Sequence, residues 1–183
     1  YCVFDREMHA DAVARLQLET DLRLAIDAGQ LAVFYQPITA LTTGQIMGFE
    51  ALVRWQHPER GFISPSEFIP IAEETGDIIK IGVWVLEQAC RKLQVWKQMF
   101  AGVQGAELIT VSVNLSAKQL AQSDLLTNID RVLMITKLEP QSLKLEITES
   151  AIVENPVTAV RTLQALHERS ITLCIDDFGT GYS

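Results

Sequence analysis

Three short segments in the second half of the chain constrain the fold most, because each alternates between aliphatic and polar residues. They cover residues 109–114, 143–148 and 171–176. The aliphatic sets are Val111 with Val113, Leu145 with Ile147, and Leu173 with Ile175. Since successive side chains of a β-strand point to opposite faces of a sheet, each segment predicts a strand with one aliphatic face and one polar face.

Helical patterns separate these strands. Ser123 and Asn155 precede stretches whose apolar residues recur at helical spacing. The short loops between strands and helices predict right-handed crossovers and a mainly parallel sheet. An open sheet with helices on both faces would be apolar on both faces, whereas a barrel covered by helices outside tolerates a polar interior. We therefore predict an α/β fold, a TIM-like (β/α) barrel truncated after about five of the eight strands that a complete barrel has.

The first half of the chain also has readable patterns. They predict helices over residues 7–28, 66–75 and 77–99, and strands over residues 31–36 and 45–55. The two strands are close enough in sequence to form an antiparallel hairpin. Residues 57–65 contain two prolines and a glycine and predict a loop. The apolar residues of the last helix face all directions, so we expect this helix to be buried on every side.

Charge and cysteine content exclude several classes of function. Lys and Arg total 15 against 23 Asp and Glu, a net charge of -8, so there is no basic surface for a DNA or RNA polymer or an anionic membrane. Cys2, Cys90 and Cys174 are scattered without metal-ligand spacing, which argues against a disulfide framework or a zinc site and favours the cytoplasm. No apolar run is long enough to cross a bilayer.

Candidate ligands for a metal ion lie in the polar sets of the strands. Asn114, Glu146 and Asp176 are near the carboxyl ends of their strands, where barrel enzymes place their sites, and Glu50 has a similar place in the second strand. Taken singly, each residue could equally be a helix cap or a turn former. Together, converging carboxylates would repel one another unless a cation neutralised them. An oxygen-only ligand set favours Mg²⁺ or Mn²⁺.

Two further residues extend this candidate site. Asp177 follows Asp176, and paired aspartates can serve two metal ions about 4 Å apart in phosphoryl chemistry. Arg54 lies four residues after Glu50 on the same side of its strand and is suited to hold a phosphate by a bidentate contact. The alternative for Arg54 is a salt bridge to Glu50 or Glu59.

Six motifs, in this order along the chain, resemble those of the EAL domain family of cyclic di-GMP phosphodiesterases. They are Tyr35-Gln36-Pro37, Glu50-Ala51-Leu52 within residues 49–55, residues 64–73, Val113-Asn114-Leu115-Ser116, residues 146–150, and residues 176–183. The resemblance implies a TIM-like barrel whose first strand is antiparallel. It also implies metal-dependent hydrolysis of cyclic di-GMP to linear pGpG in bacterial second-messenger signalling.

The resemblance assigns roles to individual residues. It implies that two ions, Mg²⁺ or Mn²⁺, are held by Glu50, Asn114, Glu146 and Asp176, with Asp177 serving the second ion. Asp177 and Glu149 then act in catalysis, Glu149 by steadying the loop after Asp177. Nucleotide contacts are implied for Gln36, Leu52 and Arg54.

The resemblance also implies a domain organisation. Residues 1–15 resemble the start of a linker helix that follows a GGDEF diguanylate cyclase domain, and residues 16–183 resemble an EAL domain that is incomplete at its C-terminus. The family's catalytic lysine falls beyond Ser183, so we expect the chain as given to lack turnover. The intact domain is expected to be a homodimer, with upstream GGDEF or sensory domains that can anchor the parent chain to a membrane. The alternatives are a non-catalytic cyclic di-GMP sensor and a dimerisation module.

Overall fold

The computed structural model describes residues 6–176, with side chains from residue 13 onward except that of Glu154. The chain divides into two compact units. The first unit comprises Tyr1–Ala32 and Val53–Ile78, and the second comprises Val33–Leu52 and Ile79–Ser183. Among the described residues, no helix has both the length and the apolar character needed to cross a membrane.

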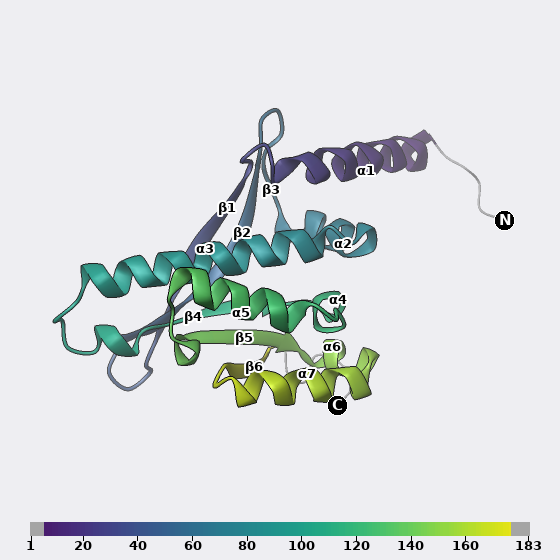
Figure 1. The fold of residues 1–183 in the computed structure, drawn as a ribbon. Helices are drawn as coiled ribbons and strands as arrows, with labels where there is room; N and C mark the ends of the chain where they lie inside the picture. Colours follow the sequence, from purple (N-terminus) through teal and green to yellow (C-terminus); the bar gives the residue numbers. More distant parts are fainter. Residues whose placement is uncertain (1–5, 177–183) are drawn as a thin grey trace. The chain divides into compact units, whose positions relative to one another are not determined.

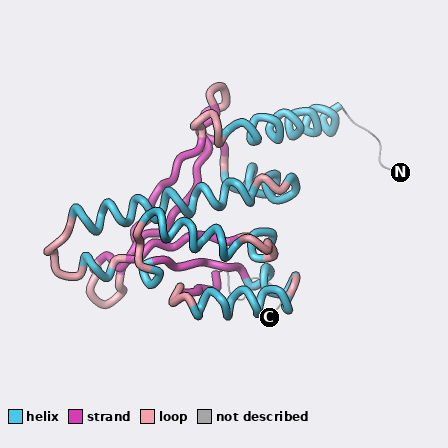
Figure 2. Tube along the Cα trace, in the orientation of Figure 1, coloured by secondary structure: helices cyan, strands magenta, loops and turns pink. Residues whose placement is uncertain are grey.

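The strands form a single mixed sheet (Figures 1 and 2). They are β1 (Leu31–Thr39), β2 (Ile46–His57), β3 (Gly61–Ile63), β4 (Thr110–Leu115), β5 (Leu143–Thr148) and β6 (Thr172–Asp176). The order is β1-β2-β4-β5-β6, and β3 pairs with β2 in the antiparallel direction. The pairs β2/β4, β4/β5 and β5/β6 are parallel. A turn that is closed by a 2.9 Å bond from Ala40 N to Gln45 O joins β1 to β2, as the predicted antiparallel hairpin requires.

The helices lie before β1 or in the crossovers between the parallel strands. They are α1 (Arg6–Ala25), α2 (Pro65–Thr75), α3 (Ile78–Met99), α4 (Ala117–Leu120), α5 (Leu125–Thr136), α6 (Glu149–Glu154) and α7 (Pro156–Glu168), with short 3-10 turns at Ala106–Leu108 and Pro140–Ser142. Each crossover leads to the next strand along the sheet, and the order never reverses as it does in a doubly wound sheet. This sequential order is that of a TIM-like barrel, which confirms the predicted fold class.

The aliphatic faces of β4 and β5 form the centre of the second unit. Val111, Leu143 and Leu145 are at most 1% exposed, as their alternation predicts. Helices α3, α5 and α7 add buried residues, among them Leu93, Ile129 and Leu166. On β6, Ile175 of the predicted aliphatic set is 56% exposed, because the described sheet ends at this strand and Ile175 has strand neighbours on one side only.

The first unit has a core of its own. Trp55 and Phe68 are fully buried and meet edge to face, with ring centroids 5.7 Å apart. The Trp55 indole N–H donates to Gln30 Oε1 at 3.1 Å. Helix α1 lies against α2, and its buried residues are Leu18, Leu22 and Ala25.

Two predictions about the elements are wrong. The predicted loop over residues 57–65 contains β3, because Phe62 and Ile63 pair with Gln56 and Trp55 of β2. Helix α3 is not buried on every side: Val95 is 48% and Met99 67% exposed. The exposed side of α3 also carries charged residues such as Arg91. Single apolar side chains among charged ones are common on protein surfaces.

Candidate active site

The acidic and amide residues predicted from the sequence lie on one face of four neighbouring strands. In the register of the sheet, Glu50 of β2 lies opposite Ser112 of β4. Two residues further along β4, Asn114 lies opposite Glu146 of β5. Cys174 lies opposite Glu146 on β6 and precedes Asp176 by two residues. Because side chains two residues apart share a face, all of these positions point to the same side of the sheet.

A direct contact joins the first two of these strands. Asn114 Nδ2 donates a hydrogen bond to Glu50 Oε1 at 2.8 Å. The strands are close here because Gly48 lies opposite Thr110, and a Cβ at Gly48 would lie 2.7 Å from the Thr110 carbonyl oxygen. Gly48 therefore permits the close approach of β2 and β4 just before Glu50.

The electrostatics of this face centre on Glu146, which is half-buried. Burial is the largest cause that raises the pKa of the Glu146 carboxyl above its usual value, and the nearby carboxylates of Glu50 and Asp176 raise this pKa further. The Ser112 hydroxyl and the Lys144 ammonium lower the same pKa. Glu50 and Asp176 therefore lie close enough to Glu146 to disfavour its charged form.

Two further residues, Ser112 and Lys144, lie on the face of Glu146, and the sequence predicted no role for them. Ser112 is 1% exposed, and among the described residues its Oγ has no hydrogen-bond partner of good geometry. Lys144 lies directly opposite Ser112. The Ser112 hydroxyl lies close enough to Glu146 to lower its pKa but in a geometry that does not complete a good hydrogen bond, so a ligand could still bond to it.

This donor set suits a hard divalent cation in its chemistry. Carboxylate, amide and hydroxyl oxygens are the ligands that Mg²⁺ and Mn²⁺ prefer, and a cation would relieve the repulsion that raises the Glu146 pKa. Across the part of the chain that the structure describes, however, no three His, Cys, Asp or Glu residues are gathered tightly enough to hold a metal ion.

Two of the predicted catalytic residues follow β5 and β6 in the sequence. Asp177, after β6, lies outside the described residues. Glu149 is the first residue of α6, directly after β5, and is half-buried. Helix α6 begins there because the Thr148 hydroxyl accepts a bond from the Ala151 N–H at 3.4 Å. Thr148 lies opposite Asp176, the last residue of β6. Glu149, which follows Thr148, is therefore near the end of β6.

The predicted nucleotide contacts lie on β1 and β2. Leu52 and Arg54 alternate with Ala51 and Trp55, which are at most 3% exposed, so Leu52 and Arg54 are on the side of β2 that carries Glu50. Arg54 Nη1 donates to the carbonyl oxygen of Val53 at 2.8 Å.

Gln36 of β1 is exposed. Its neighbour Tyr35 points to the opposite side of β1, where it meets Trp96 of α3 edge to face at 4.9 Å. The Tyr35 hydroxyl donates to the carbonyl oxygen of Gln88 at 3.3 Å. Burial raises the pKa of Tyr35 to about 12, so this hydroxyl stays protonated and Tyr35 is a packing residue that orients Gln36 outward.

Comparison with known proteins identifies relatives of this chain. The EAL domain family matches residues 19–183. The bifunctional diguanylate cyclase/cyclic di-GMP phosphodiesterase MucR of Pseudomonas aeruginosa is 42% identical over 183 residues, which are 100% of this chain and 26% of MucR. The cyclic di-GMP phosphodiesterase PdeR of Escherichia coli is 39% identical over 183 residues, 100% of this chain and 27% of PdeR. The chain thus spans about a quarter of the length of these relatives.

A solved structure shows the same fold. The PaMucR phosphodiesterase in complex with c-di-GMP superposes with a TM-score of 0.84 at 41% identity, over 91% of this chain and 66% of that chain. The family match covers both compact units and contains all of the candidate site residues. The chain therefore belongs to the EAL domain family.

Proposed function

We propose that this chain is part of a metal-dependent phosphodiesterase that hydrolyses cyclic di-GMP to linear pGpG in bacterial second-messenger signalling. The observation that carries the proposal is the row of oxygen donors on one face of β2, β4, β5 and β6. The relatives MucR and PdeR are named as cyclic di-GMP phosphodiesterases. In the reaction, water adds across one of the two phosphodiester bonds, which opens the ring and leaves a terminal phosphate.

The metal ligands are proposed to be Glu50, Asn114, Glu146 and Asp176, with Asp177 serving a second ion. Mg²⁺ or Mn²⁺ held there would lower the pKa of the attacking water and stabilise the charge that develops on the phosphate. The Asn114 Nδ2 donates to Glu50, which leaves the Asn114 Oδ1 as the amide atom that can bind a cation. Glu149 is proposed to steady the loop after Asp177.

Binding of the nucleotide is proposed to involve Gln36, Leu52 and Arg54. The exposed amide of Gln36 can donate to a phosphate or to a base edge. Leu52 offers an apolar contact to a guanine ring. The planar guanidinium of Arg54 suits two oxygens of one phosphate, and it is always charged at physiological pH.

The larger organisation is also part of the proposal. Residues 16–183 would belong to the EAL domain, with residues 1–15 leading from an upstream GGDEF or sensory domain. MucR, with its two named activities, and the oxygen sensor protein DosP, of which this chain covers 22%, are both much longer than the chain. We propose a cytoplasmic location for the domain and a homodimeric intact form.

The decisive experiment measures metal binding and hydrolysis separately in the full-length protein. Isothermal titration with Mn²⁺ is expected to show that Glu50→Ala and Asp176→Ala lose most of the metal affinity, because each removes a charged ligand. Formation of pGpG from cyclic di-GMP should fall with the metal affinity. Glu168→Ala is the matched control, since Glu168 is an exposed acid at the end of α7.

The same experiment separates the alternatives. Unchanged Mn²⁺ affinity in both ligand variants would contradict the metal assignment. Binding of cyclic di-GMP without any pGpG in the wild-type protein would identify a sensor. If neither the nucleotide nor Mn²⁺ binds and the protein is dimeric, the chain serves as a dimerisation module.

A further inference from the structure

Gln119 follows the end of β4, and neither the sequence motifs nor the acidic residues of the polar face give it a role. Gln119 is 7% exposed and belongs to α4, which starts directly after the turn that follows Asn114. Helix α4 has four residues, so its own hydrogen bonds contribute little to holding it in place. Its contacts with the surrounding structure must decide where the turn lies.

Gln119 closes that turn through a reciprocal pair of hydrogen bonds. The Ser116 N–H donates to Gln119 Oε1 at 3.1 Å, and the Gln119 N–H donates to Ser116 Oγ at 3.3 Å. This is a capping box. Ser116 is two residues after Asn114, so the Gln119 side chain holds the backbone that immediately follows Asn114.

The Gln119 carboxamide lies directly against Gly82 of α3. A Cβ at Gly82 would lie 1.8 Å from Gln119 Nε2 and 2.6 Å from Gln119 Cδ, which is far too short for a nonbonded contact. Gly82 has no positive φ, so its backbone does not require glycine. Glycine is a poor helix former, and the contact with Gln119 explains why it stands inside α3.

A small cavity adjoins the same contact. Its volume is about 20 Å³, and its lining includes Gly82, Gln119, Asn114 and Leu115. A space of this size holds about one water molecule and cannot take up a displaced carboxamide. If Gln119 is pushed away from Gly82, it must therefore release Ser116 or move the end of β4.

We propose that Gln119, seated against Gly82, is the residue that positions Asn114. It acts through the backbone: Gln119 fixes Ser116, and Ser116 fixes the end of β4, where Asn114 reaches Glu50 at 2.8 Å. The inference rests on the proposed function, in which Asn114 is a metal ligand. Gln119 itself contacts neither metal nor nucleotide in this arrangement.

The first test uses the full-length protein and Mn²⁺ alone as the probe. Gln119→Ala removes the acceptor for Ser116 without creating a clash, and it is expected to weaken Mn²⁺ binding about 10-fold to 100-fold, as losses of groups that orient metal ligands do. Gln122→Ala is the matched control. Gln122 is an exposed glutamine of the same segment, whose Nε2 donates only to the Lys118 carbonyl oxygen among the described contacts, and its loss should leave Mn²⁺ affinity unchanged.

The second test asks whether Gly82 and Gln119 act as one unit. Gly82→Ala drives a methyl group into the Gln119 carboxamide and should weaken Mn²⁺ binding in the same way. In the double variant Gly82→Ala/Gln119→Ala the clash is gone, so its affinity should equal that of Gln119→Ala alone. Losses that multiply in the double variant would overturn the proposal.

The third test measures the position of Asn114 without metal. With selective ¹⁵N-asparagine labelling of the full-length protein, Gln119→Ala should shift the Asn114 side-chain amide resonances. Gln119→Glu keeps an acceptor for the Ser116 N–H and should restore them. If Gln119→Ala lowers thermal stability but leaves these resonances and Mn²⁺ affinity unchanged, Gln119 is only a helix cap and the proposal fails.

The failure of the proposed function would look different. If Asn114→Ala and Glu50→Ala bind Mn²⁺ as the wild-type protein does, the ligand set is wrong. The Asn114 resonances in Gln119→Ala and Gln119→Glu then still decide the positioning role: a shift that Glu reverses supports it, and no shift refutes it.

Discussion

The acidic side chains of two regions have different neighbours. Several of those in the first unit lie beside basic groups, whereas those on the polar face of β2, β4, β5 and β6 lie beside one another. In the first unit, four acids have basic partners. Asp21 lies 3.2 Å from the ring of His57, Glu74 pairs with Arg15, and Glu19 and Asp77 both pair with Arg23. On the polar face, Glu50, Glu146 and Asp176 lie close enough to raise the pKa of one of them.

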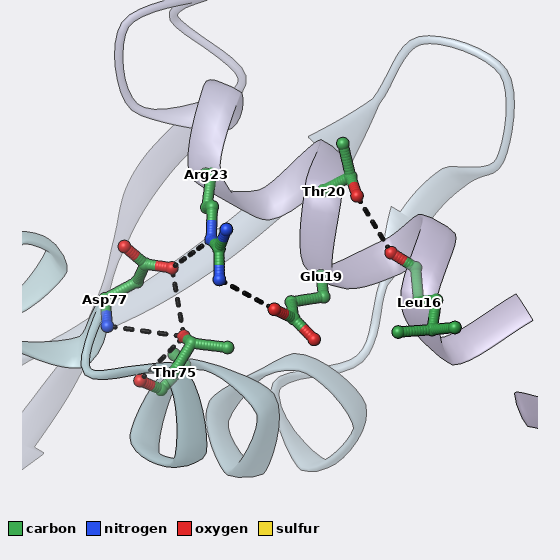
Figure 3. Close-up of polar contacts among 7 residues, drawn as sticks. Leu16, Glu19, Thr20, Arg23, Thr75 and Asp77 are labelled. Carbon is green, nitrogen blue, oxygen red and sulfur yellow. Dashed lines mark hydrogen bonds and ion pairs between the residues drawn. The ribbon is translucent and has the colours of Figure 1, made fainter.

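Figure 3 shows the contacts of two of these acids, Glu19 and Asp77. Arg23 reaches Glu19 at 2.7 Å and Asp77 at 3.5 Å. The Thr75 hydroxyl donates to Asp77 Oδ2 at 2.9 Å. The charges on α1 are therefore tied to the junction between α2 and α3 by bonds within the first unit.

This difference distinguishes the paired acids of the first unit from the acids of the polar face that are proposed to bind a cation. Of the paired acids, Glu74 and Asp77 have partners on another element, α1, whereas Glu19 pairs with Arg23 within α1. Glu50 and Asp176 raise the pKa of the half-buried Glu146, and a bound cation would relieve this repulsion. We expect substitutions in the first unit to lower stability, and neutralisation on the polar face to raise stability while it lowers metal affinity.

The largest effect on stability is expected from Asp21→Ala. It leaves the His57 side chain, which is 8% exposed, without a partner for Nε2, and a buried polar group that loses its partner costs about 1–3 kcal/mol. Hydrogen exchange of peptides that cover β2 and β3 in the full-length protein should show this loss. Asp27→Ala, at an exposed position, is the control, and equal exchange in the two variants would contradict the assignment of Asp21 as a structural acid.

A smaller effect of opposite sign is expected from Glu146→Gln. Without metal at pH 7, this variant should be more stable than the wild-type protein by less than about 1 kcal/mol, because water screens a half-exposed carboxylate. Added Mn²⁺ should stabilise the wild-type protein more than the variant, since only the former keeps all three carboxylates. Thermal unfolding with and without Mn²⁺ measures both quantities, and a variant that is less stable without metal would break the comparison.

The pH dependence of the unfolding free energy should also report the raised pKa of Glu146 in the metal-free protein. Because the pKa of Glu146 is raised, the folded state binds this proton more tightly than the unfolded state does. The contribution of Glu146 is therefore favourable at acidic pH and is lost as the pH rises from the ordinary glutamate pKa through the raised value. Unfolding followed from about pH 4, near the ordinary glutamate pKa, to about pH 7 should give a slope of the unfolding free energy against pH that is more positive in Glu146→Gln than in the wild-type protein. Identical slopes would contradict the prediction.

The smallest effect is expected at Arg15 and Glu74, whose side chains are 55% and 67% exposed. A double-mutant cycle with Arg15→Ala and Glu74→Ala should give a coupling free energy below about 1 kcal/mol. Added salt should reduce it further. A larger coupling that persists at high salt would show that the link between α1 and α2 is more than a surface ion pair.

Local periodicity was enough to predict much of this molecule. The alternation in residues 143–148 placed Leu145 in the core and Glu146 on the polar face, because the period of a strand depends only on neighbouring residues. The same rule placed Asn114 and Asp176 on the face of Glu146. The order of the motifs identified the family, since it can be read without knowledge of any contact.

Contacts between distant segments were decided only by the tertiary structure. The bond from Asn114 to Glu50, the partner of His57 and the seat of Gln119 against Gly82 join residues that are 36 to 64 positions apart. No local pattern encodes such pairs, because register and packing determine which side chains meet. Strand β3 likewise depends on a tertiary contact, because it forms by pairing with β2. The pKa of Glu146 also depends on the fold, because only the folded sheet brings its neighbouring strands side by side.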